Sequence, residues 1–117
     1  MLRRLIIALM LFTLTSSADA ASVLFKDYKA PRDAQEKTFL KIYLDGVKEG
    51  LLALNSELAL EGRQPVFCMP GKLALNVEQA EDIMMREAQM LGDVGRIYVS
   101  AILVKGLQDT FPCNEKH

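Results

Sequence analysis

The segment DAQEKTFLKIYLDGVKEGLLALNSELALE, Asp33 to Glu61, decides the fold class, because its apolar residues recur in steps of four and three. That spacing keeps them on one face of an α-helix, and the residues concerned are Phe39, Tyr43, Val47, Leu51, Leu54 and Leu58. Asp33 with Glu36 three positions later is a helix-start signal, and Gly62 followed by Pro65 is a stop signal. The sequence therefore predicts one long helix over this segment.

Two glycines lie one turn apart inside this predicted helix, at Gly46 and Gly50. Each glycine lowers the stability of the helix by about 1 kcal/mol relative to alanine. Close approach of the backbone of another helix would compensate for this loss. The sequence leaves open whether that helix belongs to the same chain or to a second protomer. The GxxxG spacing is itself a weak signal outside membranes.

Two further helices are predicted downstream, one from Val77 to Leu91 and one from Asp93 toward Asp109. Asn76 and Gln79 are expected to form the capping box of the first, and Gly92 to end it. The second is unusually apolar, which suggests burial on several sides, and its apolar residues include Ile97, Tyr98, Ala101, Ile102, Val104 and Leu107. A joint of only Gly92 and Asp93 would force the two helices antiparallel. The expected fold class is all-α, a small helical bundle of three to five helices with one disulfide.

The first twenty residues have the features of a cleavable signal peptide. Arg3 and Arg4 precede an apolar stretch from Leu5 to Leu14, which is too short to span a bilayer, and Ala18-Asp19-Ala20 is a suitable cleavage site. We therefore expect residues 1–20 to be removed and residues 21–117 to form a single helical domain in the periplasm, with no membrane association after cleavage. The alternative is an uncleaved amphipathic anchor.

Export makes Cys68 and Cys113, the two cysteines of the chain, candidates for a disulfide. A nucleophilic or redox-active cysteine is the alternative, but the sequence has no CxxC motif. Cys68 precedes the predicted helix over residues 77–91 and Cys113 follows the next one, so both sulfurs are expected at the open end of this helical pair. The opposite end would then project as a rigid tip, formed by Gly92, Asp93, Val94, Gly95 and Arg96. The simpler interpretation of this tip is an ordinary helix connector.

Composition argues against several functional classes. The 14 basic and 15 acidic residues form no basic stripe, which argues against nucleic acid as a partner. His117 is the only histidine, which makes a Ser/His/Asp triad, a Cys/His dyad or a His-rich metal site improbable. Glu78, Glu81 and Asp82 fall in the first turns of a predicted helix, where they complement its dipole, and are interpreted as a solvated face. We expect no enzymatic activity, no metal and no other cofactor.

Two short motifs point to a family. Phe67-Cys68-Met69-Pro70 and Phe111-Pro112-Cys113, separated by about forty residues of predicted helix, resemble the Rap/Tai family of immunity proteins against type VI secretion amidase effectors. Tyr43 to Val47 and Gln79 also fit that pattern, so the resemblance covers Phe39 to Cys113. The chain departs from the pattern at Gly92, Asp93 and Val94, where family members often carry proline and histidine, and at Gly106-Leu107, where Ala-Leu is usual.

The resemblance implies a small periplasmic protein, often dimeric, with a disulfide between Cys68 and Cys113. Such a protein binds a peptidoglycan amidase injected by a neighbouring cell and blocks its active-site groove. The first hypothesis is therefore an inhibitor of a cognate amidase effector, with Asp93 and Arg96 at the contact and a homodimer possible. The alternative is a periplasmic accessory or chaperone-like binding protein that uses its methionines and the long first helix. A broad exposed apolar patch on those helices would favour the alternative, and a polar protruding turn would favour the inhibitor.

Overall fold

The longest element of the protein is the helix α3 (Ala34–Leu60), and both of its ends are set by local signals. At the start, the Asp33 carboxylate accepts the backbone N–H of Glu36 at 2.8 Å. At the end, Gly62 adopts a positive φ of 68°, and the N–H groups of Gly62 and Arg63 donate to the carbonyls of Ala59 and Leu58. This is the Schellman arrangement that terminates many helices. The predicted long helix is confirmed.

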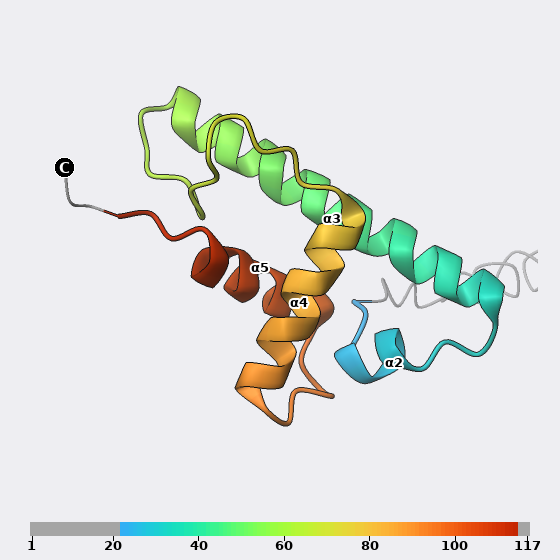
Figure 1. The fold of residues 1–117 in the computed structure, drawn as a ribbon. Helices are drawn as coiled ribbons and strands as arrows, with labels where there is room; N and C mark the ends of the chain where they lie inside the picture. The colour runs from blue at the N-terminus through green and yellow to red at the C-terminus, as the bar shows by residue number, and fades with distance from the viewer. Residues whose placement is uncertain (1–21, 115–117) are drawn as a thin grey trace, which may run out of the picture.

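The computed structural model describes residues 22–114 and is all-helical there (Figure 1). Besides α3 it contains α2 (Phe25–Lys29), α4 (Val77–Leu91) and α5 (Val99–Thr110), and α2, α4 and α5 all lie on one side of α3. Extended pairing within residues 22–114 is limited to an isolated bridge between Leu24 and Tyr98. The prediction of a small all-α bundle is thus confirmed. The predicted signal peptide falls outside the described residues.

The buried face of α3 differs from the predicted stripe. Tyr43, Val47 and Leu51 are partly buried against the core, whereas Phe39 is 62 % exposed and Leu54 is 45 % exposed. The most buried positions are instead Leu44 and Lys48. Apolar residues occur on more than one side of α3, so periodicity alone does not select the side that α4 and α5 cover.

Lys48 shows how a basic residue occupies a buried position on this face. Its ammonium lies 2.8 Å from a carboxylate oxygen of Asp45 and 2.9 Å from one of Glu49. These two pairs raise the pKa of Lys48, while the aliphatic stem of the side chain is covered by its neighbours. Lys48 therefore contributes to packing without leaving an unpaired charge.

The core lies where α3, α4 and α5 meet. Asn76 and Gln79 form the predicted capping box of α4, with N–H to side-chain oxygen distances of 2.8 and 3.0 Å. The largest fully buried side chains are Phe67, Leu44, Met84, Ile102, Leu103, Leu107 and Val99. Gly106 of α5 faces Ile83 of α4 so closely that an added Cβ would lie 2.9 Å from the Ile83 Cγ2 atom. The two helices approach at this point because the position has no side chain.

The start of the last helix was predicted wrongly. α5 begins at Val99, not at Asp93, because residues 92–98 pair with the segment before and within α2. The N–H groups of Phe25 and Lys26 donate to the carbonyls of Ile97 and Gly95, at 2.9 and 3.0 Å. The connector between α4 and α5 is therefore longer than the two-residue joint from which an antiparallel pair was inferred. In Figure 1, α5 crosses α4 obliquely.

The predicted disulfide between Cys68 and Cys113 is confirmed, with Cα atoms 4.9 Å apart. The N–H of Cys68 also donates to the carbonyl of Phe111 at 2.8 Å. The chain before α4 is consequently tied to the chain after α5 by one covalent bond and one backbone hydrogen bond.

Candidate partner-binding surface

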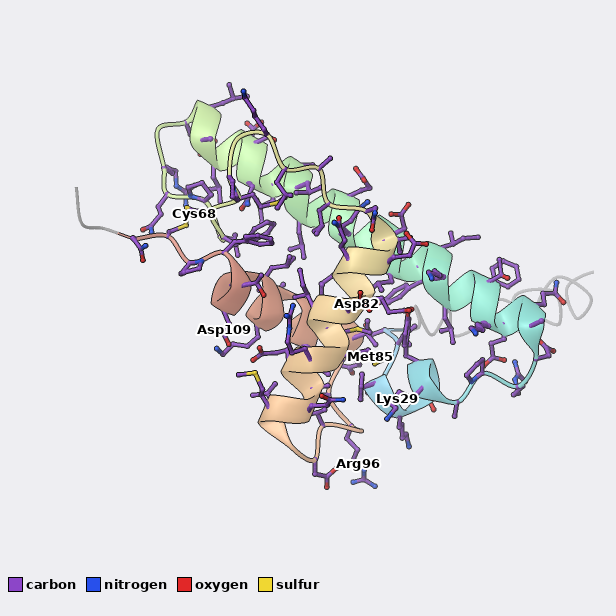
Figure 2. The ribbon with its side chains drawn as sticks, viewed as in Figure 1. Lys29, Cys68, Asp82, Met85, Arg96 and Asp109 are labelled. Carbon is purple, nitrogen blue, oxygen red and sulfur yellow. A yellow bond between two sulfur atoms is a disulfide. The ribbon has the colours of Figure 1, made fainter. Side chains whose placement is uncertain are left out.

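The connector between α4 and α5 lies at the end of the helical pair remote from the disulfide, as the labels of Arg96 and Cys68 in Figure 2 show. Of the five residues predicted to form the tip, Gly92, Asp93 and Arg96 are exposed. Val94 is only 4 % exposed and packs into the core, and Gly95 is half-buried beside Lys26. The two charged side chains of the predicted tip, Asp93 and Arg96, are therefore exposed, and Val94 anchors the connector from within.

Backbone hydrogen bonds hold the connector in one conformation. The carbonyls of Gly95 and Ile97 accept N–H groups from the α2 region, and the N–H of Ile97 donates to the carbonyl of Val94 at 2.9 Å. At the other end, the N–H of Val99 donates to the carbonyl of Val23 at 2.9 Å. A loop that is already ordered loses little conformational entropy when it binds a partner.

Large apolar side chains are exposed at positions close to these two charged residues in the sequence. Met90 is 71 % exposed and Tyr98 is 50 % exposed, and Leu91 and Ile97 are also exposed. We call the six residues Met90, Leu91, Asp93, Arg96, Ile97 and Tyr98 the tip surface. Exposed aromatic, methionine and arginine residues of this kind are enriched at protein interfaces. The tip surface is therefore a candidate protein-binding surface that offers both apolar and charged groups.

Sequence reasoning had placed Ile97 and Tyr98 inside a buried helix and so missed them as surface residues. One signal was present in the sequence: the apolar residues of the predicted third helix occur on more sides than a small bundle can cover. The methionines of the preceding helix gave a similar indication. At about 100° per residue, Met84, Met85 and Met90 cannot all lie on one face of the helix, so at least one of them is expected at the surface. In the structure Met84 is buried and Met90 is exposed.

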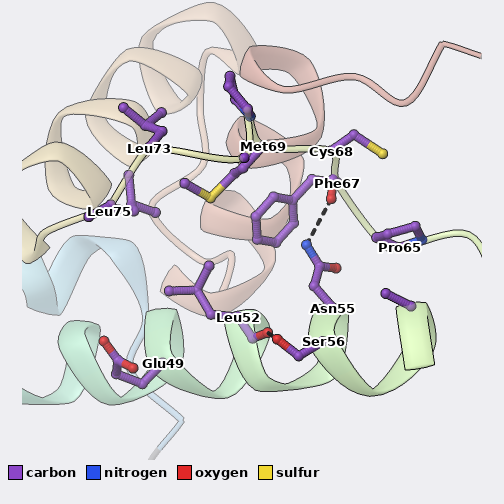
Figure 3. Close-up of a pocket in the computed structure, with 14 residues that line it drawn as sticks. Glu49, Leu52, Asn55, Ser56, Pro65, Phe67, Cys68, Met69, Leu73 and Leu75 are labelled. Carbon is purple, nitrogen blue, oxygen red and sulfur yellow. Dashed lines mark hydrogen bonds between the residues drawn. The ribbon is translucent and has the colours of Figure 1, made fainter.

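A second surface feature lies beside the disulfide (Figure 3). It is an open hollow of about 570 Å³ between the C-terminal half of α3 and residues 65–75. Asn55 fixes this segment, because its amide donates to the carbonyl of Phe67 and its side-chain oxygen accepts the N–H of Val66, both at 2.8 Å. Leu52, Met69 and Leu73 provide apolar lining, and Glu49 is the ionisable side chain at the rim. The hollow can accept an apolar group but has no constellation for acid–base or nucleophilic chemistry.

Glu78 and Asp82 at the start of α4 are exposed, as expected of a solvated face, whereas Glu81 is partly buried and makes contacts with other helices. Tyr28 donates its hydroxyl proton to the Glu81 carboxylate, and the Lys41 ammonium lies 3.6 Å from Glu78 and 3.9 Å from Glu81. Burial, and then the hydrogen bond to Glu81, raise the pKa of Tyr28. These contacts attach α4 to α2 and α3.

A second set of charged groups joins α4 to α5. Burial, and then a hydrogen bond that the protonated Glu87 carboxyl donates to the Asp109 carboxylate, raise the pKa of Glu87. The ammonium of Lys105, 2.6 Å from Asp109, holds the pKa of Asp109 below its usual range. Among residues 22–114, no group of three or more His, Cys, Asp or Glu side chains is arranged to hold a metal ion. These charges therefore act as links between helices.

No helix of the described segment is both long enough and apolar enough to cross a membrane. Comparisons of the chain with protein-family models, with curated proteins and with solved structures gave no match. The family resemblance accordingly remains a hypothesis carried by the motifs around Cys68 and Cys113.

Proposed function

We propose that the protein is a periplasmic immunity protein that binds a type VI secretion peptidoglycan amidase and occludes its active site. The observation that carries the proposal is the tip surface: exposed apolar and charged side chains on a hydrogen-bonded connector, remote from the disulfide. Family resemblance supplies the class of partner, and the tip surface supports the mode of binding.

The tip surface supports inhibition by occlusion because its side chains suit the surroundings of a hydrolase cleft. Tyr98 and Met90 offer apolar contact area, which is where most of the binding energy of an interface concentrates. Asp93 and Arg96 carry opposite charges and can pair with polar groups around the catalytic residues, which improves specificity and the association rate. Blocking access to substrate requires no catalytic group on the inhibitor.

The alternative function, a periplasmic accessory or chaperone-like binding protein, is favoured by a different observation. Phe39, Ile42, Leu54 and Leu60 of α3 are all exposed, which is the apolar patch that such a protein would use to hold partner chains. The two functions use different faces of the molecule, so substitutions can separate them.

Inhibition of peptidoglycan hydrolysis by a set of amidase effectors tests the proposal. The oxidised mature protein should inhibit at least one of them, and Asp93→Arg and Arg96→Glu should each weaken that inhibition about tenfold or more. Arg63→Glu is the matched control, because Arg63 is an exposed arginine at the C-terminal end of α3. Inhibition that survives both tip substitutions would exclude the tip as the contact. Failure to inhibit any amidase, combined with suppression of aggregation of unrelated unfolded proteins, would favour the alternative.

A further inference from the structure

A pocket of about 250 Å³ lies between α2, the N-terminal half of α3, and α4. It is smaller and more enclosed than the hollow beside the disulfide, and the two share no lining residue. Lys29 of α2 and Met85 of α4, which both line it, lie close together in Figure 2. None of its lining residues belongs to the tip surface, so the proposed function does not involve this pocket.

Part of the pocket lining is apolar. Leu40 of α3 and Met85 of α4 line it, and both side chains are partly buried against the core. Pro31, in the connection between α2 and α3, adds a third apolar side chain. A dry cavity of about 150 Å³ can hold a benzene ring. The volume of this pocket therefore suits an apolar group of about five or six carbon atoms and excludes a large ligand.

The rest of the lining carries an excess of positive charge. It includes three lysines, Lys29, Lys37 and Lys41. Among the described lining residues the one carboxylate is that of Glu81, which accepts the hydroxyl proton of Tyr28 and lies 3.9 Å from the Lys41 ammonium. Within residues 22–114, neither Lys29 nor Lys37 forms an ion pair. Two ammonium groups of the pocket are thus available to an anion.

Contacts between helices hold the walls of the pocket in place. The hydrogen bond from Tyr28 to Glu81 joins α2 to α4, and the Lys41 ammonium, 3.6 Å from Glu78, joins α3 to α4. Tyr28 itself is 7 % exposed, so this wall is part of the packed structure. A pocket that exists before the ligand arrives requires little ordering of side chains on binding.

We propose that this pocket binds a small carboxylate that carries an apolar group of about five or six carbon atoms. The apolar group lies against Leu40 and Met85, and the carboxylate lies near the ammonium groups of Lys29 and Lys37. Such a combination of apolar lining with a few charged groups that fix orientation is typical of small-molecule sites. A neutral molecule of the same size gains only the apolar contacts, and an inorganic anion gains only the attraction to the lysines.

Titration of the isotope-labelled, oxidised mature protein with sodium hexanoate, followed in amide NMR spectra at constant ionic strength, tests the proposal. A ligand of about eight non-hydrogen atoms should bind with a dissociation constant on the order of 1 mM. Shift changes should saturate by about 20 mM and should concentrate in residues 28–31, 37–41 and 81–85. Hexanamide, which lacks the charge, and acetate, which lacks the chain, should each bind about fivefold more weakly or less well still.

Lys37→Glu reverses one charge of the pocket and should raise the dissociation constant for hexanoate about fivefold or more. Lys37 is exposed and lies near the start of α3, where an acidic side chain is compatible with the helix dipole, so the variant should fold. Lys72→Glu is the matched control, because it makes the same change at an exposed lysine outside the pocket. It should leave the dissociation constant within about twofold of the wild type.

Three results would overturn the proposal. The first is the absence of saturable shifts, or shifts that concentrate elsewhere, such as in residues 65–75. The second is binding of hexanamide or acetate as tight as that of hexanoate. The third is a Lys37→Glu variant that binds hexanoate as well as the Lys72→Glu control does. Because the amidase assay probes the tip surface, each of these results is independent of the proposed function.

Discussion

Gly106→Ala should destabilise the protein, although alanine favours helices over glycine. A Cβ at position 106 would lie 2.9 Å from the Cγ2 atom of Ile83, 3.1 Å from the Ile83 carbonyl oxygen and 3.2 Å from the Cβ of Glu87. The Ile83 side chain can rotate away, but its carbonyl belongs to the middle of α4 and can move only if the helix moves. The added methyl group therefore pushes α4 and α5 apart.

The expected loss follows from two opposing terms. Overpacking a closely packed contact costs about 1–3 kcal/mol, and replacing a helical glycine by alanine returns about 1 kcal/mol. The net loss is up to about 2 kcal/mol in the free energy of unfolding, which for a domain of this size lowers the melting temperature by up to roughly 15 °C. In the family that the chain resembles, Ala-Leu is usual where this chain has Gly106-Leu107. The substitution is informative because position 106 of this chain has no room for the methyl group of alanine.

Thermal and urea unfolding followed by far-UV circular dichroism would measure this loss. Gly46→Ala is the matched control, because it makes the same change in a helix where an added Cβ meets open space. The control should gain up to about 1 kcal/mol. If Gly106→Ala gains as much stability as Gly46→Ala, the close approach of α4 and α5 at this residue is wrong.

Three further predictions concern the links that hold the helices together. Reducing the disulfide, or replacing Cys68 and Cys113 together by alanine, should lower the free energy of unfolding by about 4 kcal/mol for a 45-residue separation, seen as a lower urea midpoint; an unchanged midpoint would contradict this. Asn55→Ala removes two hydrogen bonds to the segment before Cys68 and should cost about 1–3 kcal/mol, whereas Ser56→Ala should be nearly neutral in the same assay. Native stability should fall as pH rises past the ordinary phenol range, because the raised pKa of Tyr28 means that the unfolded state loses its proton first. Tyr28→Phe should lack this part of the decline, and identical pH profiles would show that the phenol does not titrate differently in the two states.

The parts of the fold that were predicted correctly depend on signals within a few residues. Asp33, Asn76 and Gly62 set helix ends through their own side chain or backbone, so α3 and α4 could be located from the sequence. The start of α5 could not, because the hydrogen bonds that keep residues 92–98 out of a helix come from residues 23–26, far away in the sequence. For the same reason α2, a five-residue helix, was not predicted.

The exposure of residues in the candidate site was predicted correctly for Asp93 and Arg96 and wrongly for the apolar residues. Asp93 and Arg96 follow a helix-ending glycine, which is a good indication of a turn at the surface. Ile97 and Tyr98 were predicted to be buried because they are hydrophobic, yet both side chains are exposed in the connector. Similarly, the apolar residues of α3 exceed what the neighbouring helices cover, and only the packing in three dimensions shows that Phe39 and Ile42 are outside.

The central claim, that the tip surface contacts an amidase, is tested most directly by amide hydrogen exchange of the protein with and without an amidase effector that it inhibits. Binding should slow exchange in peptides covering residues 90–98 and leave residues 65–75, which border the hollow beside the disulfide, unchanged. Protection confined to residues 65–75 or to α3, with none in the connector, would contradict the account.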